Sequence, residues 1–229
     1  MKIVTFSGID GAGKSTQIAS LKSCLGDEGI RVASLTFWDD VAVLSRFREF
    51  MSYKAFRGDL GIGTPEKPLH RRDKNVTSWP VTVARFVLYL ADSFKLQMVV
   101  KRVARKGVDV VIFDRYIYDE LANLPLDSWF ARGFTRLLLS VAPKPDSAFL
   151  IDADPKAARA RKPEYPLEFL VRNRQSYLRL SRMTGDMTII EHLSIRAAAA
   201  KMKEIALAML GRPEQCAALP LHCEALSGK

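Results

Sequence analysis

Cysteine is scarce in this chain of 229 residues. The three cysteines are Cys24, Cys216 and Cys223, and no two of them form a C-x-x-C pair. An odd number of widely separated thiols predicts neither a disulfide framework nor a zinc site. The three histidines are equally scattered, which argues against a histidine metal site or a catalytic triad built on them.

Long hydrophobic runs are also missing. The N-terminal stretch Ile3–Phe6 is too short for the core of a signal peptide. No segment approaches the roughly 18 to 20 apolar residues that a membrane-spanning helix needs. We therefore expect a cytosolic protein with no membrane partner.

Glycine and proline are few, at 13 and 11 residues, whereas hydrophobic residues make up 48% of the chain and charged residues 26%. This balance excludes disordered, collagen-like and low-complexity proteins. A chain of this length can fill one large core. We expect a single domain over residues 1–211, followed by a loosely attached tail over residues 212–229.

Acidic residues are outnumbered, with 25 Asp and Glu against 35 Lys and Arg, a net charge of +10. Such a surplus is typical of proteins that bind nucleic acid, anionic membranes or phosphorylated small molecules. Residues 154–182 hold eight basic and three acidic residues, so half of the surplus, +5, lies in one stretch. This concentration favours a small anionic ligand, and we expect no nucleic-acid partner.

Short apolar runs alternate with helix-compatible stretches along the chain. The predicted strands cover residues 3–6, 31–37, 110–113, 148–151 and 188–190. The predicted helices cover residues 16–26, 80–106, 126–140, 155–183 and 195–210. This alternation indicates an α/β protein, a three-layer P-loop fold in which helices cover both faces of a five-stranded parallel sheet.

The most specific motif is a phosphate-binding loop. Residues 8–16, GIDGAGKST, fit the pattern G-x-x-x-x-G-K-[ST] and lie between the first strand and the first helix. Glycines let backbone N–H groups point at phosphate oxygens, and the N-terminus of the following helix adds positive charge. We expect Lys14 to bridge the β- and γ-phosphates and Ser15 to ligate Mg²⁺. The predicted nucleotide-binding residues are Gly8, Asp10, Gly11, Ala12, Gly13, Lys14, Ser15 and Thr16.

Three motifs together resemble the thymidylate kinase family of nucleoside monophosphate kinases. The first is the loop itself, with an acidic residue at Asp10; the second, FDRY at residues 113–116, is similar to the D-R-Y element of the family. The third, IDADP at residues 151–155, is similar to a strand end that leads into a basic lid. The resemblance covers roughly residues 1–210. It implies ATP and Mg²⁺ as cofactors, a nucleotide acceptor such as dTMP, and a homodimer.

The resemblance also implies roles for individual residues. Asp114 would orient Mg²⁺ or organise the acceptor, and Arg115 would offer a forked donor to the acceptor phosphate or the transferring group. Asp10 would contact the acceptor as well as belong to the loop. Arg159 and Arg161 would belong to a lid, over about residues 154–175, that closes on ATP.

The acceptor side departs from the family pattern. Where the family carries F-P-x-R after the second strand, this chain has FWDD at residues 37–40. Asp39 or Asp40 could hydrogen-bond to an acceptor hydroxyl, and we expect Asp39 to contact the substrate. The aromatic-x-x-x-Arg element becomes Tyr89 followed by Ser93. Tyr89 could stack on a base or simply belong to the core. Residues 58–79 resemble a polar insertion, which could form a mobile flap.

Several alternatives stay open at this point. The acceptor could be an unphosphorylated deoxynucleoside, since an acid after the second strand could serve its hydroxyl. The chain could also be a P-loop ATPase that binds nucleic acid, or a regulatory relative with little turnover. The apolar side of residues 83–100 could form the dimer interface or be buried within one subunit.

Overall fold

The computed structural model describes residues 1–43, 79–191 and 194–212. The strands are β1 (Lys2–Ser7), β2 (Val32–Thr36), β3 (Val110–Asp114), β4 (Ser147–Ile151) and β5 (Met187–Ile190). The helices are α1 (Lys14–Asp27), the π-helical turn η1 (Phe37–Val41), α3 (Trp79–Ala104), α4 (Ile117–Leu121), α5 (Trp129–Val141), α6 (Pro155–Arg161), α7 (Leu167–Thr184) and α8 (Ile195–Met209).

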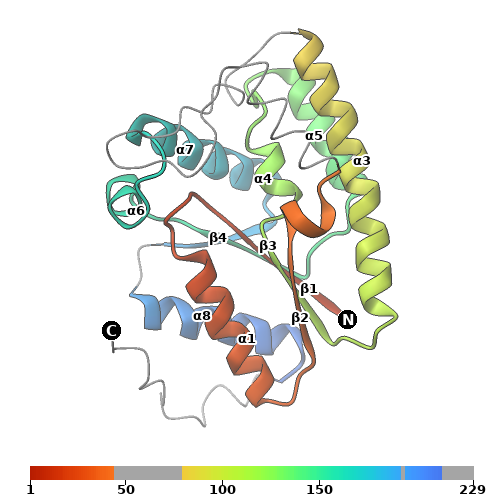
Figure 1. Cartoon of the computed structure of the whole chain (residues 1–229), viewed down its shortest axis with the longest axis vertical. Helices are drawn as coiled ribbons and strands as arrows, with labels where there is room; N and C mark the ends of the chain where they lie inside the picture. The colour runs from red at the N-terminus through yellow and green to blue at the C-terminus, as the bar shows by residue number, and fades with distance from the viewer. Residues whose placement is uncertain (44–78, 192–193, 213–229) are drawn as a thin grey trace.

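The five strands form one parallel sheet in the order β2-β3-β1-β4-β5. The helices α1 and α8 pack together on one face, whereas α3, α4, α5 and α7 cover the other (Figure 1). Because both faces are covered, the inner strands are mostly buried, and β3 buries four consecutive apolar residues. The predicted α/β fold with a five-stranded parallel sheet is confirmed.

One predicted helix is two. The stretch 155–183 divides into α6 and α7, with a break at residues 162–166. Pro163 and Pro166 explain the break, since a proline inside a helix removes one hydrogen bond and clashes with the preceding turn. Asp154 begins α6, and its carboxylate accepts a hydrogen bond from the backbone N–H of Ala157 at 2.9 Å.

Two short elements had no counterpart in the predicted pattern. The turn η1 follows β2 directly and carries Asp39 and Asp40, while α4 follows β3 after the motif that ends at Tyr116. Both are five residues long, too short to show a helical period in the sequence. They matter because both lie at the carboxyl ends of their strands.

The carboxyl edge of the sheet gathers the predicted functional segments. The loop at residues 8–13 follows β1, η1 follows β2, Arg115 follows β3, and Asp152 follows β4. In open parallel sheets ligands bind at this edge. No helix within the described ranges is long and apolar enough to cross a membrane. The tail boundary stays a prediction, because residues 213–229 lie outside the described part of the chain.

Candidate active site

The phosphate-binding loop has the backbone that its glycines predict. Gly8, Gly11 and Gly13 have φ values of 142°, 79° and 95°, which side-chain-bearing residues rarely adopt. A Cβ on Gly11 would lie 2.2 Å from the carbonyl oxygen of Ala158 in α6. Gly11 is therefore needed both for its conformation and because helix α6 packs directly against the loop.

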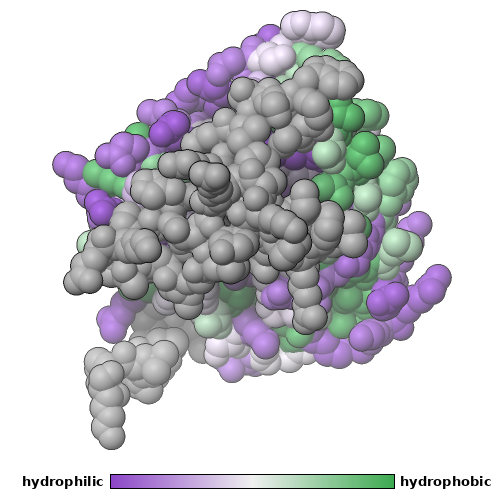
Figure 2. All heavy atoms as spheres, turned by 45° about the horizontal axis from the view of Figure 1, so that its top comes forward, coloured by the Kyte–Doolittle hydropathy of each residue, from purple (hydrophilic) through white to green (hydrophobic). Residues whose placement is uncertain are grey.

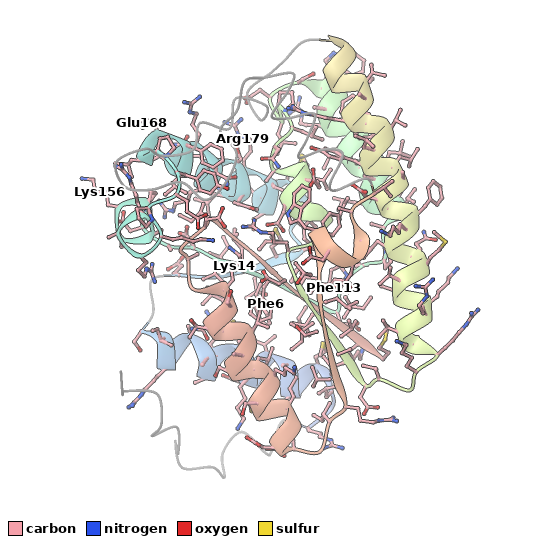
Figure 3. All side chains as sticks on the ribbon, viewed as in Figure 1. Phe6, Lys14, Phe113, Lys156, Glu168 and Arg179 are labelled. Carbon is pink, nitrogen blue, oxygen red and sulfur yellow. The ribbon has the colours of Figure 1, made fainter. Side chains whose placement is uncertain are left out.

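Lys14 begins α1 and is almost completely buried. Its Nζ donates hydrogen bonds to the carbonyl oxygens of Gly8 and Ile9, each at 2.9 Å. Burial, assisted by the positive charge of Arg115, lowers the pKa of Lys14 to about 8, although nearby carboxylates oppose the shift. The side chain is thus folded back on its own loop, and Figure 3 shows Lys14 at the start of α1, near the middle of the molecule.

Among the described residues, Arg115 is the one non-glycine residue with a left-handed backbone, at φ 68°. Its Nη2 lies 2.5 Å from Oδ1 of Asp10, and its Nη1 lies 3.1 Å from Oδ1 of Asp119. Burial alone would lower the pKa of the guanidinium, but Tyr177 and the carboxylates of Asp10 and Asp119 raise it overall. Arg115 thus stays charged and is held between the loop and α4.

Asp119 is a site residue that the sequence analysis missed. Its carboxylate is buried and accepts four hydrogen bonds, two on each oxygen. The donors are the Ser7 hydroxyl, the Tyr116 backbone N–H, the Arg115 guanidinium and the Tyr177 hydroxyl. One signal was available: an acid at the third residue of a helix often accepts a hydrogen bond at its start.

The segment predicted as a lid lies beside the loop. Arg174 of α7 forms a two-pronged ion pair with Asp152, at 2.6 and 2.7 Å, which ties α7 to the end of β4. Arg159 is half-buried and Arg161 exposed. Arg161 approaches the loop, since its Nη1 lies 3.9 Å from the place of a Cβ on Gly13. Lys156, on the same helix, lines a shallow depression with Arg159.

On the side where we expect the acceptor, Asp39 lies in η1 and is exposed. Asp40, also exposed, accepts the backbone N–H of Thr36 at 2.7 Å. Tyr89 is buried in the hydrophobic core, 5% exposed, so its stacking role stays a prediction. The buried carboxylate of Asp92 on α3 accepts the backbone N–H of Val43 at 2.6 Å and so anchors the segment after η1. The expected flap at 58–79 lies outside the described residues, except that Trp79 begins α3.

The remaining predicted residues lie in the phosphate-binding loop, in the first turn of α1 and at the end of β3. Ser15 and Thr16 are exposed in the first turn of α1, Ala12 is buried, and Asp114 is half-buried at the end of β3. A hydroxyl and one carboxylate suit Mg²⁺, which keeps several waters and shares its coordination with phosphates. Within the described ranges no three acidic, histidine or cysteine side chains gather as a metal site.

The parallel sheet and the loop after β1 define a P-loop nucleotide-binding protein. The chain is 28% identical over 163 residues to thymidylate kinase of Pelodictyon phaeoclathratiforme, covering 70% of this chain and 65% of that protein. It is 29% identical over 205 residues to a probable thymidylate kinase of Pyrococcus abyssi, covering 83% and 88%. It is 32% identical over 162 residues to thymidylate kinase of Clavibacter michiganensis, covering 69% and 66%.

The alignments with the Pelodictyon and Clavibacter proteins thus span slightly less than two thirds of those relatives. No protein-family model matches the chain. The fold and the loop are those of a nucleotide-binding protein, and the relatives that the chain resembles are named thymidylate kinases.

Proposed function

We propose that this protein transfers the γ-phosphoryl group of ATP to a nucleoside monophosphate, with dTMP as the acceptor and Mg²⁺ as the metal. The observation that carries the proposal is the contact between the two halves of the site. Asp10 of the phosphate-binding loop is ion-paired with Arg115, and Arg115 in turn influences the pKa of Lys14. A donor on Lys14 and an acceptor on Arg115 would therefore meet at the carboxyl edge of the sheet.

The residues would act by position and charge. Backbone N–H groups of the loop and the start of α1 would hold the triphosphate, and Lys14 would leave the carbonyls of Gly8 and Ile9 to contact it. Arg115 would donate two guanidinium hydrogen bonds to the acceptor phosphate. Arg159 and Arg161 would add charge from α6 as the transferring group develops its negative charge.

Mg²⁺, when bound, would neutralise negative charge on the phosphates of the nucleotide. Ser15 and Asp114 are the residues that would hold it, the first through its hydroxyl at the start of α1 and the second from the end of β3. Both supply hard oxygen donors, as this ion prefers.

The test is an assay of ADP formation with ATP, Mg²⁺ and a panel of acceptors: dTMP, other nucleoside monophosphates and free deoxynucleosides. We expect turnover to be highest with dTMP. Lys14→Ala should lower kcat by about 100-fold or more, because it removes a charge aimed at the transferring phosphoryl group. A wild-type chain that binds ATP yet phosphorylates no acceptor, with Lys14→Ala indistinguishable from it, would contradict the proposal.

A second acceptor class is favoured by one observation. Asp39 is exposed in η1 at the acceptor side, and Ser93, where the family carries an arginine, is buried and donates to the Tyr89 carbonyl at 2.9 Å. A free hydroxyl acceptor would use such an acid. In the same panel, thymidine turnover that exceeds dTMP turnover and is lost in Asp39→Asn would favour a deoxynucleoside kinase. Exclusive turnover of dTMP would exclude it.

The nucleic-acid-binding ATPase belongs to a different class and needs a different measurement. Its binding to DNA should weaken steeply as salt rises, because binding releases counterions from the phosphate backbone. We expect no such binding. Half of the +10 charge lies in residues 154–182, around the predicted lid, and the charge does not form a stripe along the chain.

The proposed assembly is a homodimer through α3. Val83, Val87, Phe94 and Met98 recur at spacings of four and seven residues on the side of α3 away from the core, and Val87 and Met98 are 62% and 60% exposed. Figure 2 shows apolar side chains gathered along the edge of the molecule formed by α3. An apolar helix face of this kind is typical of surfaces buried between subunits.

A further inference from the structure

Arg115 needs outside support to keep its conformation. A left-handed backbone is disfavoured for any residue with a Cβ, so contacts around it must hold the turn between β3 and α4. One contact comes from the backbone: the N–H of Arg115 donates to the carbonyl of Phe6 at 2.9 Å. The guanidinium is held on two sides, by Asp10 of the phosphate-binding loop and by Asp119 of α4, and it is Asp119 that has further contacts of its own.

The Oδ2 atom of Asp119 fixes the carboxylate in place. It accepts the backbone N–H of Tyr116 at 2.9 Å, which closes the start of α4, and the hydroxyl of Ser7 at 2.7 Å, which ties it to β1. A residue that only capped α4 would need the first of these bonds alone. Asp119 is thus locked to the strand that leads into the phosphate-binding loop.

The Oδ1 atom points at the guanidinium. It accepts Nη1 of Arg115 at 3.1 Å and the hydroxyl of Tyr177 at 2.7 Å. Tyr177 is fully buried on α7, the helix that also carries Arg174, and burial raises the pKa of its hydroxyl well above the usual value. The hydroxyl therefore stays a donor. All four neighbours donate, which suits a carboxylate anion and no neutral amide.

We infer that Asp119 is a positioning residue that acts through Arg115. Asp119 orients the guanidinium of Arg115 toward the acceptor side of the site, and its hydrogen bond with Tyr177 makes this orientation depend on the position of α7. The expected effect of Asp119 on catalysis rests on the proposed function, whereas the inference that Asp119 holds Arg115 in place does not. An amide at this position would present NH₂ either to Arg115 or to the donors at the start of α4. Asp119→Asn should therefore release Arg115 while it preserves the size of the side chain.

The first arm of the experiment needs no substrate. The method is ¹⁵N–¹H NMR of arginine side chains, and the Arg115 signal is assigned as the one lost in Arg115→Lys. A guanidinium held by hydrogen bonds exchanges its protons with water slowly. We expect Asp119→Asn to abolish the slow Arg115 signal and Tyr177→Phe to weaken it. Tyr116→Phe is the matched control, because its hydroxyl donates to the Pro143 carbonyl at 2.6 Å and is not among the four donors to the Asp119 carboxylate.

The second arm measures kinetics. Asp119→Asn should lower kcat/KM for the acceptor by about 10- to 100-fold, with the Kd of ADP unchanged, since a misplaced group near the reacting atoms has effects of that size. In an Arg115→Lys background, Asp119→Asn should lower kcat/KM for the acceptor little further, because Asp119 acts through Arg115. Multiplicative losses in the double variant would overturn the inference.

The spectra and the kinetics together distinguish a failure of the proposed function from a failure of the positioning role of Asp119. If wild type phosphorylates no acceptor while Asp119→Asn still releases the Arg115 signal, the proposed function fails and the positioning role of Asp119 stands. If Asp119→Asn leaves both the Arg115 signal and the kinetics like those of Tyr116→Phe, Asp119 does not position Arg115, whatever the acceptor.

Discussion

At the scale of the residue, the protonation of Lys14 is set by its burial. With its Nζ bonded to two loop carbonyls and its pKa lowered to about 8, the side chain is partly neutral at mildly alkaline pH in the free protein. A bound polyphosphate would favour the charged form and raise that pKa. Nucleotide binding and proton binding at Lys14 are therefore linked.

This linkage predicts the direction of a pH effect. Because the pKa is lower in the free protein than in the complex, binding of ADP should take up a proton at mildly alkaline pH, about half a proton at pH 8. The affinity should fall as pH rises through about 8. Calorimetry in two buffers of different ionisation enthalpy measures the uptake. Lys14→Arg, which stays charged, is the control and should show none; equal uptake in both proteins would refute the linkage.

At the scale of the element, an ion pair ties helix α7 to the end of strand β4. Arg174 contacts both carboxylate oxygens of Asp152, and this hydrogen bonding raises the pKa of the guanidinium. Asp152 lies at the end of β4, and Ile151, the residue before it, contacts Gly8. The pair therefore connects the lid segment to the first glycine of the phosphate-binding loop.

Removal of this pair should loosen α6 and α7 selectively. Arg174→Gln should lower the free energy of unfolding by about 1 to 3 kcal/mol, because it leaves the carboxylate of Asp152 without its charged partner. Hydrogen exchange should speed up in residues 155–184 more than in β1 or β3. Arg172→Gln, an exposed arginine on the same helix, is the control. Equal exchange rates in the two variants would count against the role of the pair.

At the scale of the whole molecule, the exposed side of α3 predicts the assembly. A stable dimer buries roughly 800 Å² on each partner, which a helix of 26 residues can supply together with the neighbouring α5. Light scattering should give twice the 25.7 kDa chain mass. Val87→Glu with Met98→Lys should give monomers, because charges would enter an apolar interface. Val171→Lys, at an exposed apolar residue of α7, should stay dimeric; a wild-type monomer would refute the proposal.

The sequence was sufficient for the sheet and for the loop, because buried parallel strands are continuous apolar runs and the loop motif has its own spacing. It was insufficient for Asp119, whose partners Ser7 and Tyr177 lie 112 and 58 residues away and become neighbours only in the fold. The division of α6 from α7 was readable in Pro163 and Pro166. The burial of Tyr89 could not be predicted from the sequence, since a tyrosine in an apolar run fits a core as well as a base-binding face.

The guanidinium of Arg115, shared between Asp10 and Asp119, has a consequence for selectivity. An incoming anion must compete with a carboxylate that is already in place, and at a distance of 2.5 Å. Chloride or inorganic phosphate lacks further contacts to offset that competition, whereas a nucleotide has its sugar and base. With the proposed role of Arg115, the resting protein would thereby be shielded from the small anions around it, and a ligand that also binds elsewhere would gain access to the arginine.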